Sequence, residues 1–304
     1  MALDSVVKEK ISLEVIRILI SAIDSTPQDI ASNWDNPFFR AFSVKCVNKL
    51  EEKVSDALFF ISLSSWLQGL NMTLGQTFFE SIAHYLCEGK KREYTSKKLG
   101  NLQITQTQRY NIGSIIANLS NTINSPSLRD ENAQLFQDFN TPLVNASDFS
   151  ADVFFENADL IIAVELKSVK PNSGEMRGEK QKILEGKAAL YRLFPSKRIY
   201  FYIGFPFNPT VNPVNNEDVT GYDKSRFLNT IINMNKYFAY EETLAASELW
   251  NFLSGTENTM EEILEIINTI STTEFITKFH LLIDNSKRSA PKYLEQLREW
   301  NFFF

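Results

Sequence analysis

Short apolar runs divide the middle of the chain into predicted strands. Five consecutive aliphatic residues at 160–164 predict a buried strand, because the run is too short to cover several turns of a helix. The apolar triplet at 153–155 predicts another short strand directly upstream. The four residues between them, 156–159, are Glu, Asn, Ala and Asp, which tolerate turn geometry. We therefore expect the two strands to pair antiparallel.

A helix and a third strand follow this hairpin. Apolar positions at helical spacing predict a helix from about residue 179 to residue 194. The aromatic and branched residues at 198–205 predict a strand. The connection through the helix is long enough for a right-handed crossover, so the strands at 160–164 and 198–205 are expected to be parallel. The predicted fold class is α/β, with a central mixed β-sheet flanked by helices.

The segments around this core are expected to be mostly helical or irregular. Apolar stripes at helical spacing predict helices in residues 1–60, and the remainder after residue 226 is also expected to be mostly helical. A capping box of Thr73 and Gln76 begins a predicted helix that extends to Glu88. Residues 121–150 are rich in Asn, Ser, Thr and Asp and are expected to be irregular.

The composition is that of an ordinary globular protein. Hydrophobic residues make up 43% of the 304 residues, enough to bury a sizeable core. No stretch approaches the length of a membrane span, and the first residues lack the layout of a signal peptide, so we expect a cytoplasmic protein without membrane association. Cys46 and Cys87 have no metal-binding spacing, so a structural zinc is not expected.

The distribution of charge matters more than the net charge of −6. From Lys167 to Arg198 there are nine Lys or Arg against three Glu, a local net charge of +6. A second basic cluster begins with Lys90-Lys91-Arg92. Both clusters flank the candidate site described next, as a phosphate-binding surface requires, although a solvated face is the alternative.

Asp152 and the triplet Glu165-Leu166-Lys167 form the candidate site. Alternation along the strand places Glu165 and Lys167 on one face, and the hairpin brings Asp152 beside them. This grouping suits magnesium-dependent phosphodiester hydrolysis, with the metal bound by Asp152, Glu165 and the Leu166 carbonyl. Lys167 would hold the attacking water or stabilise the transition state. The alternative is a solvated charge pair that caps a core strand.

Asp152 followed by Glu165-x-Lys167 on the next strand resembles the PD-(D/E)XK nuclease superfamily, above all its type II restriction endonucleases. The likeness covers roughly residues 70–205, and Ala151 stands where the nominal motif has Pro. The order strand, strand, helix, strand is that of the superfamily's catalytic core. A narrower likeness, to the TdeIII-type restriction enzymes, rests on residues 64–66, 74–80 and 165–172. It implies an interrupted GG/CC palindrome as the target.

The resemblance implies a cofactor, a substrate and an organisation for the chain. We expect Mg²⁺ as the cofactor, with Mn²⁺ as a substitute, and a homodimer on palindromic double-stranded DNA. A cognate DNA methyltransferase is expected as a genetic neighbour and not as a stable partner. Residues 1–70 would form a dimerisation or DNA-contacting layer, 71–205 the catalytic core, and 206–304 a recognition loop and helical C-terminal region, all in one compact domain. A repair or recombination nuclease of the same fold and a non-catalytic DNA-binding protein are the alternatives.

Further candidate residues follow from the helices and loops around the site. Many PD-(D/E)XK enzymes carry an additional Glu on a helix ahead of the strands, and Glu80 would match it, the alternative being a surface Glu paired with Lys or His. Asn, Lys and Arg side chains read base edges, and Lys and Arg bind phosphates. The candidate DNA-binding residues are Lys170, Arg177, Lys180, Lys187, Asn208, Asn212, Asn215, Lys224 and Arg226.

Overall fold

The computed structural model describes residues 2–24, 77–94, 102–167, 175–211 and 223–270, together with the isolated positions 69, 218, 220, 221, 274 and 277. The chain divides into two units. One comprises Met1–Val7 and Ile82–Leu264, and the other comprises Lys8–Ser81 and Glu265–Phe304. The candidate residues Asp152, Glu165 and Lys167 all belong to the first unit.

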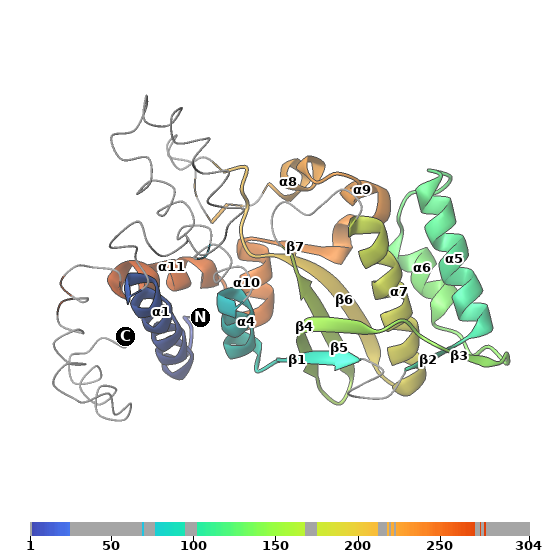
Figure 1. Ribbon diagram of the computed structural model, residues 1–304, viewed down its shortest axis with the longest axis horizontal. Coiled ribbons are helices and arrows are strands. Elements are labelled where there is room, and N and C mark those ends of the chain that lie inside the picture. Colours follow the sequence, from blue (N-terminus) through green and yellow to red (C-terminus); the bar gives the residue numbers. More distant parts are fainter. Residues whose placement is uncertain are drawn as a thin grey trace, which may run out of the picture. The chain divides into compact units, whose positions relative to one another are not determined.

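A five-stranded mixed sheet organises the first unit (Figure 1). Its strand order is β1-β4-β5-β6-β7. β1, β4 and β5 are antiparallel neighbours, whereas β5, β6 and β7 run parallel. The strands are β1 (Lys90–Tyr94), β4 (Phe149–Glu156), β5 (Leu160–Leu166), β6 (Arg198–Phe205) and β7 (Thr243–Ala245).

The hairpin and the crossover predicted from the sequence are confirmed. β4 pairs with β5 in a register that places Val153 opposite Val164. β5 then pairs in parallel with β6, from Leu160 opposite Arg198 onward. The helix between these parallel strands is α7 (Glu175–Leu193), which begins somewhat earlier than predicted. Local patterns were sufficient here because each strand contains a single apolar or aromatic run.

Helix α7 covers one face of the sheet. Gly186 lies where the helix meets two aromatic rings: a Cβ there would come within 3.3 Å of Phe201 and 3.4 Å of Phe149. The absence of a side chain therefore lets α7 approach β4 and β6 closely. Ile183 and Leu190 of the same helix are buried in the core beneath it.

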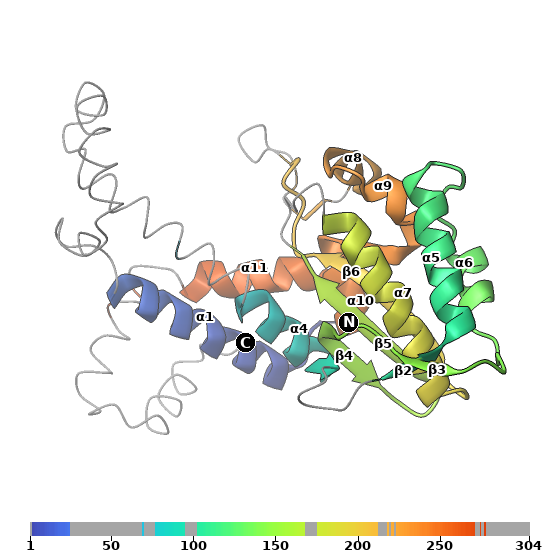
Figure 2. The ribbon, with the colours of Figure 1, turned by 45° about the vertical axis from the view of Figure 1, so that its right-hand side comes forward.

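Two further helices pack on the outer side of α7, α5 (Gln106–Ser120) and α6 (Leu128–Leu135) (Figures 1 and 2). A capping box of Thr105 and Gln108 begins α5. A second, two-stranded sheet joins β2 (Gln103–Thr105) to β3 (Leu143–Asn145). The prediction that residues 121–150 are irregular is therefore wrong in part, because buried contacts of Leu135 stabilise a helix within a polar sequence.

The opposite face of the sheet is covered by α10 (Ser247–Ser254). Tyr202, one position along β6 from Phe201, contacts the ring of Phe252 with ring centroids 5.1 Å apart. Gly204 allows Leu249 of α10 to pack directly on the sheet, where a Cβ would lie 3.0 Å from that side chain. The site-bearing strands are thus held between two helical layers.

The remaining elements are α1 (Ser5–Asp24), α4 (Phe79–Cys87), α8 (Lys224–Thr230), α9 (Met234–Tyr237), the 3₁₀ helix η4 (Tyr240–Glu242) and α11 (Thr259–Ile270). In α1, Ile11, Val15 and Ile16 are buried, as the apolar stripe predicts. The helices predicted between residues 25 and 60, and the capping box at Thr73, lie outside the described residues. Within the part of the chain that the structure describes, no helix has the length and apolarity needed to cross a membrane.

Candidate active site

Asp152 lies at an irregularity in the sheet. Along β1 and β4 the paired positions move from Lys90 and Phe154 to Arg92 and Ala151, so β4 has one extra residue at this point. Such a β-bulge redirects a side chain and interrupts strand pairing. The Leu166 amide donates to Asp152 Oδ2 at 2.9 Å, so a carboxylate replaces a neighbouring strand as its acceptor. Asp152 is therefore fixed at the place where β4 leaves β5.

His84 of α4 holds the same position from the backbone side. Its Nε2 lies 2.6 Å from the Asp152 carbonyl oxygen. A carbonyl only accepts hydrogen bonds, so Nε2 is the protonated nitrogen and donates. His84 thus binds the bulged backbone, which is a positioning role.

Glu165 lies on β5 with an exposed fraction of 6%. Its Oε1 accepts hydrogen bonds from Lys182 Nζ at 2.8 Å and from Lys167 Nζ at 3.2 Å. Its Oε2 is buried and has no hydrogen-bond partner. Burial, followed by the nearby Asp152 carboxylate, raises the pKa of Glu165, while the two ammonium groups act in the opposite direction. An unpartnered buried carboxylate oxygen beside a second carboxylate is a favourable position for a cation.

Lys167 bridges two acidic residues. Its Nζ lies 3.2 Å from Glu165 Oε1 and 2.9 Å from Glu179 Oε1. Burial by itself would lower the pKa of Lys167, but Glu165 and Glu179 outweigh it, and the pKa lies above its ordinary value. The side chain is therefore a charged ammonium within the site and not a neutral amine.

Sequence reasoning missed two site residues, Glu179 and Lys182 of α7. Lys182 Nζ lies 2.8 Å from Glu165 Oε1 and 3.5 Å from Glu179 Oε2. Their spacing of three residues on one helix is the signal that could have identified them as neighbours. A further ammonium, Lys91 of β1, lies 3.5 Å from Asp152 Oδ1. Three carboxylates and three ammonium groups thus share the end of the sheet.

The donor set fits a hard divalent cation. Carboxylates of Asp152 and Glu165 and the Leu166 carbonyl supply oxygen atoms, the ligands that Mg²⁺ prefers. Among the described residues there is no group of three or more His, Cys, Asp or Glu that could hold a metal ion. A site with two protein carboxylates agrees with this, because Mg²⁺ commonly completes its shell with waters and substrate phosphates. The unpartnered Glu165 Oε2 is the observation in favour of the fit.

Lys180 and Lys187 do not face DNA, and their predicted phosphate contacts are wrong. Both side chains are fully buried. Lys180 Nζ lies 2.6 Å from Glu242 Oε2 and 2.5 Å from Glu131 Oε2, and Lys187 Nζ lies 3.1 Å from Glu242 Oε1. Burial by itself would raise the pKa of Glu242, but the two ammonium groups outweigh it and lower the pKa. These four residues, the buried charge network, fasten α7 to α6 and η4.

Two of the predicted base-reading residues are also buried. Lys224 is 3% exposed, pairs with Glu248 at 2.8 Å and donates to the Thr243 carbonyl. Asn208 is 5% exposed, and its Oδ1 accepts from the backbone and hydroxyl of Thr210. Both predictions are corrected, because these side chains are committed to local structure.

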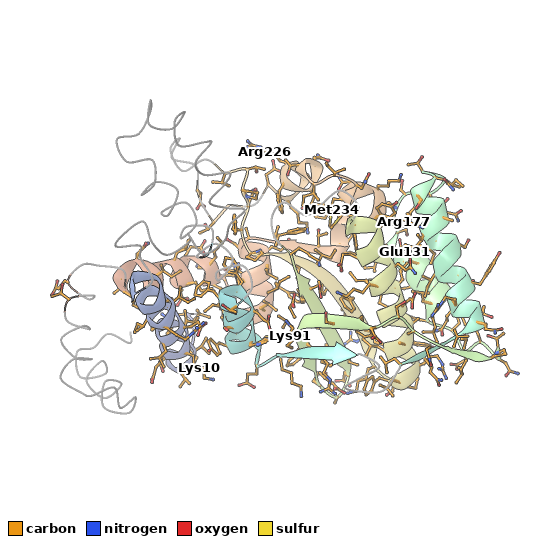
Figure 3. The ribbon with its side chains drawn as sticks, in the orientation of Figure 1. Lys10, Lys91, Glu131, Arg177, Arg226 and Met234 are labelled. Carbon is orange, nitrogen blue, oxygen red and sulfur yellow. The ribbon has the colours of Figure 1, made fainter. Side chains whose placement is uncertain are left out.

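The other predicted DNA contacts divide into two groups. Arg177 of α7 and Arg226 of α8 are exposed, so they remain predicted DNA contacts (Figure 3). Lys170, Asn212 and Asn215 lie outside the described residues.

Comparison with known proteins identifies the family. The sequence-family model described as type II restriction endonuclease, HinfI, matches residues 3–271. The chain belongs to the HinfI family of type II restriction endonucleases. It is also 41% identical over 322 aligned positions to the type II restriction enzyme MjaII of Methanocaldococcus jannaschii, covering the whole chain and 84% of that protein. No solved structure shows significant similarity to the chain.

Membership of the HinfI family confirms the predicted activity. The chain is a site-specific endonuclease, its substrate is double-stranded DNA, and enzymes of this type generally need a divalent metal ion. A repair nuclease and a non-catalytic DNA-binding protein, the alternatives that the sequence left open, do not agree with this finding. The narrower TdeIII-type likeness and its GG/CC target stay predictions.

Glu80 lies in the first turn of α4, in the unit Lys8–Ser81, and is half-buried. Its role as an additional active-site carboxylate stays a prediction. If it acts on the metal directly or through water, Glu80→Gln should lower the cleavage rate by about 10²-fold while thermal stability changes little. Single-turnover cleavage and a thermal unfolding curve test this together. Normal turnover would return Glu80 to the role of a helix-surface residue.

Proposed function

We propose that this HinfI-family endonuclease hydrolyses phosphodiester bonds at a short palindromic site by PD-(D/E)XK chemistry. Mg²⁺ is the proposed cofactor, with Mn²⁺ as a substitute. The observation that carries the proposal is the meeting of Asp152 and Glu165 where β4 leaves β5, with Glu165 Oε2 buried and unpartnered. Asp152, Glu165 and the Leu166 carbonyl would hold the metal ion.

Each residue of the site has a distinct task in this proposal. When bound, the metal ion polarises the scissile phosphate and lowers the pKa of a water molecule. Lys167, held as an ammonium by Glu165 and Glu179, stabilises charge that develops on the phosphate in the transition state. Lys91 contributes positive charge beside Asp152, where an incoming phosphate needs it.

A homodimer is the proposed assembly. Two active sites related by a twofold axis match the two strands of a palindrome. A methyltransferase encoded nearby would protect the same sequence in the host. Digestion of a plasmid with the purified protein in Mg²⁺, followed by sequencing of the ends, tests the proposal. Discrete ends at one palindromic sequence support it, and metal-independent or sequence-independent cleavage contradicts it.

Lys167→Ala should keep metal binding and specific DNA binding but lose cleavage by about 10²–10³-fold, as for a lost transition-state donor. Lys167→Arg should not restore the rate, because a planar guanidinium does not reproduce a compact ammonium. Single-turnover cleavage of a saturated complex measures the chemical step. Lys197→Ala is the matched control, because Lys197 pairs with Glu156 at the other end of β4. Undiminished chemistry in Lys167→Ala would remove Lys167 from the mechanism.

A further inference from the structure

Lys182 lies between two carboxylates that come from different elements. Its Nζ makes a hydrogen bond of 2.8 Å to Glu165 Oε1 on β5. The same nitrogen lies 3.5 Å from Glu179 Oε2 on its own helix, which is an ion pair without a hydrogen bond. One ammonium is therefore bonded to one acidic residue and close to a second.

The two carboxylate oxygens nearest to this ammonium accept different numbers of hydrogen bonds. Glu165 Oε1 accepts from both Lys182 and Lys167. Glu179 Oε2, in contrast, is buried and has no hydrogen-bond partner. A buried carboxylate oxygen without a donor is costly, so this oxygen favours any movement that brings it one. Lys182 Nζ is a donor already close to it.

The proposed metal ion and the Lys182 ammonium compete for Glu165. Mg²⁺ binds carboxylate oxygens at about 2.0–2.1 Å. An ammonium that is hydrogen-bonded to the same carboxylate would therefore lie close to a doubly charged cation. Like charges at such a distance repel strongly when they are shielded from water. Lys167 is already hydrogen-bonded to Glu179 Oε1, whereas Lys182 lies beside Glu179 Oε2, which has no donor. Of the two ammonium groups on Glu165, Lys182 is therefore the one that leaves when Glu165 ligates the metal.

The local structure permits this movement without a backbone rearrangement. Glu179 and Lys182 are three residues apart on α7, so their side chains are neighbours on one helical face. The helix itself is fastened by Lys180 and Lys187 of the buried charge network. Rotation of the Lys182 side chain is sufficient to exchange one carboxylate for the other.

We infer that Lys182 is a two-position ammonium, which holds Glu165 in the metal-free protein and transfers to Glu179 when Glu165 takes up the divalent metal ion. This inference rests on the proposed metal site. It makes Lys182 a positioning residue that sets metal affinity, and Glu179 the acceptor that makes its departure favourable. It also keeps a positive charge next to the site after the metal has bound.

The transfer is tested by measuring how tightly the DNA-free protein binds Mn²⁺. Electron paramagnetic resonance detects the Mn²⁺ that stays free. Lys182→Met should tighten Mn²⁺ binding by about tenfold, because the competing charged hydrogen bond is gone. Glu179→Gln should weaken it by about threefold, because Lys182 then stays on Glu165. In the double variant the Glu179→Gln effect should largely disappear. Lys182→Gln, which keeps a donor without the charge, should also tighten binding.

Two controls separate the possible failures. Lys197→Met removes one positive charge from the pair with Glu156 and should leave Mn²⁺ affinity unchanged. Thermal unfolding should show that each variant is folded. The transfer is wrong if Glu179→Gln weakens Mn²⁺ binding equally in the presence and in the absence of Lys182. It is also wrong if Lys182→Met fails to tighten Mn²⁺ binding. If the wild-type protein itself binds no Mn²⁺, the proposed metal site is wrong, and the transfer falls with it.

Discussion

Asp152→Ala and Glu165→Ala should each lose DNA cleavage by at least about 10³-fold, the upper end for loss of one electrostatic contact at a transition state. Each substitution removes a proposed metal ligand, and neither residue is expected to contact a base. Specific DNA binding, measured by fluorescence anisotropy in Ca²⁺, should therefore survive. Cleavage at near the wild-type rate by either variant would contradict the assignment of the site.

Asp152→Asn provides a matched variant for the first of these changes. Its side-chain oxygen can still accept the hydrogen bond from the Leu166 amide, whereas alanine loses that bond. We therefore expect Asp152→Asn to be inactive but as stable as the wild type, and Asp152→Ala to be less stable by about 1 kcal/mol. Urea unfolding separates the structural contribution of Asp152 from its contribution to cleavage.

Glu242→Gln should lower the free energy of unfolding by about 3–5 kcal/mol, as for a buried ion pair that loses one partner. Glu242 is 1% exposed and is paired with both Lys180 and Lys187. Glutamine leaves the Lys187 ammonium buried without a compensating charge. Urea unfolding monitored by circular dichroism measures the loss.

Two further variants test the physical reason for this loss. Glu156→Gln breaks a partly exposed pair with Lys197 and should cost at most about 1 kcal/mol. Lys187→Met in the Glu242→Gln background should regain part of the stability, because the unpaired ammonium is removed. A Glu242→Gln protein as stable as the Glu156→Gln control would mean that the buried charge network contributes little.

The sequence predicted the three central strands β4, β5 and β6 because their signals are local. The runs at 153–155, 160–164 and 198–205 are each a single apolar or aromatic segment, and β4, β5 and β6 contain them. Asp152 and Glu165 lie on adjacent strands of one hairpin, so the predicted hairpin was sufficient to bring them near each other. The β-bulge at Asp152 was not predicted. The three-residue strand β7 carries no such run, and its pairing depends on β6.

The charge pattern misled for a different reason. Lys180 and Lys187 are part of a basic segment that resembles a phosphate-binding surface, but Glu242 lies 62 and 55 residues away from them in sequence. A buried ion pair between distant residues has no periodicity that a local reading can detect. Both lysines lie on the buried side of α7, and the error was to expect their charges to leave it.

The hydrogen bond between the Leu166 amide and Asp152 Oδ2 gives this site a backbone reporter. Amide hydrogens inside a strand ladder exchange with solvent deuterium only when the sheet opens. The Leu166 amide hydrogen is protected by a hydrogen bond to one side chain, that of Asp152. Its exchange rate therefore depends on the rotamer of that carboxylate. If Asp152 ligates the proposed metal ion, a backbone resonance would therefore record when its carboxylate turns toward that ion, without any label on the ion or on the DNA.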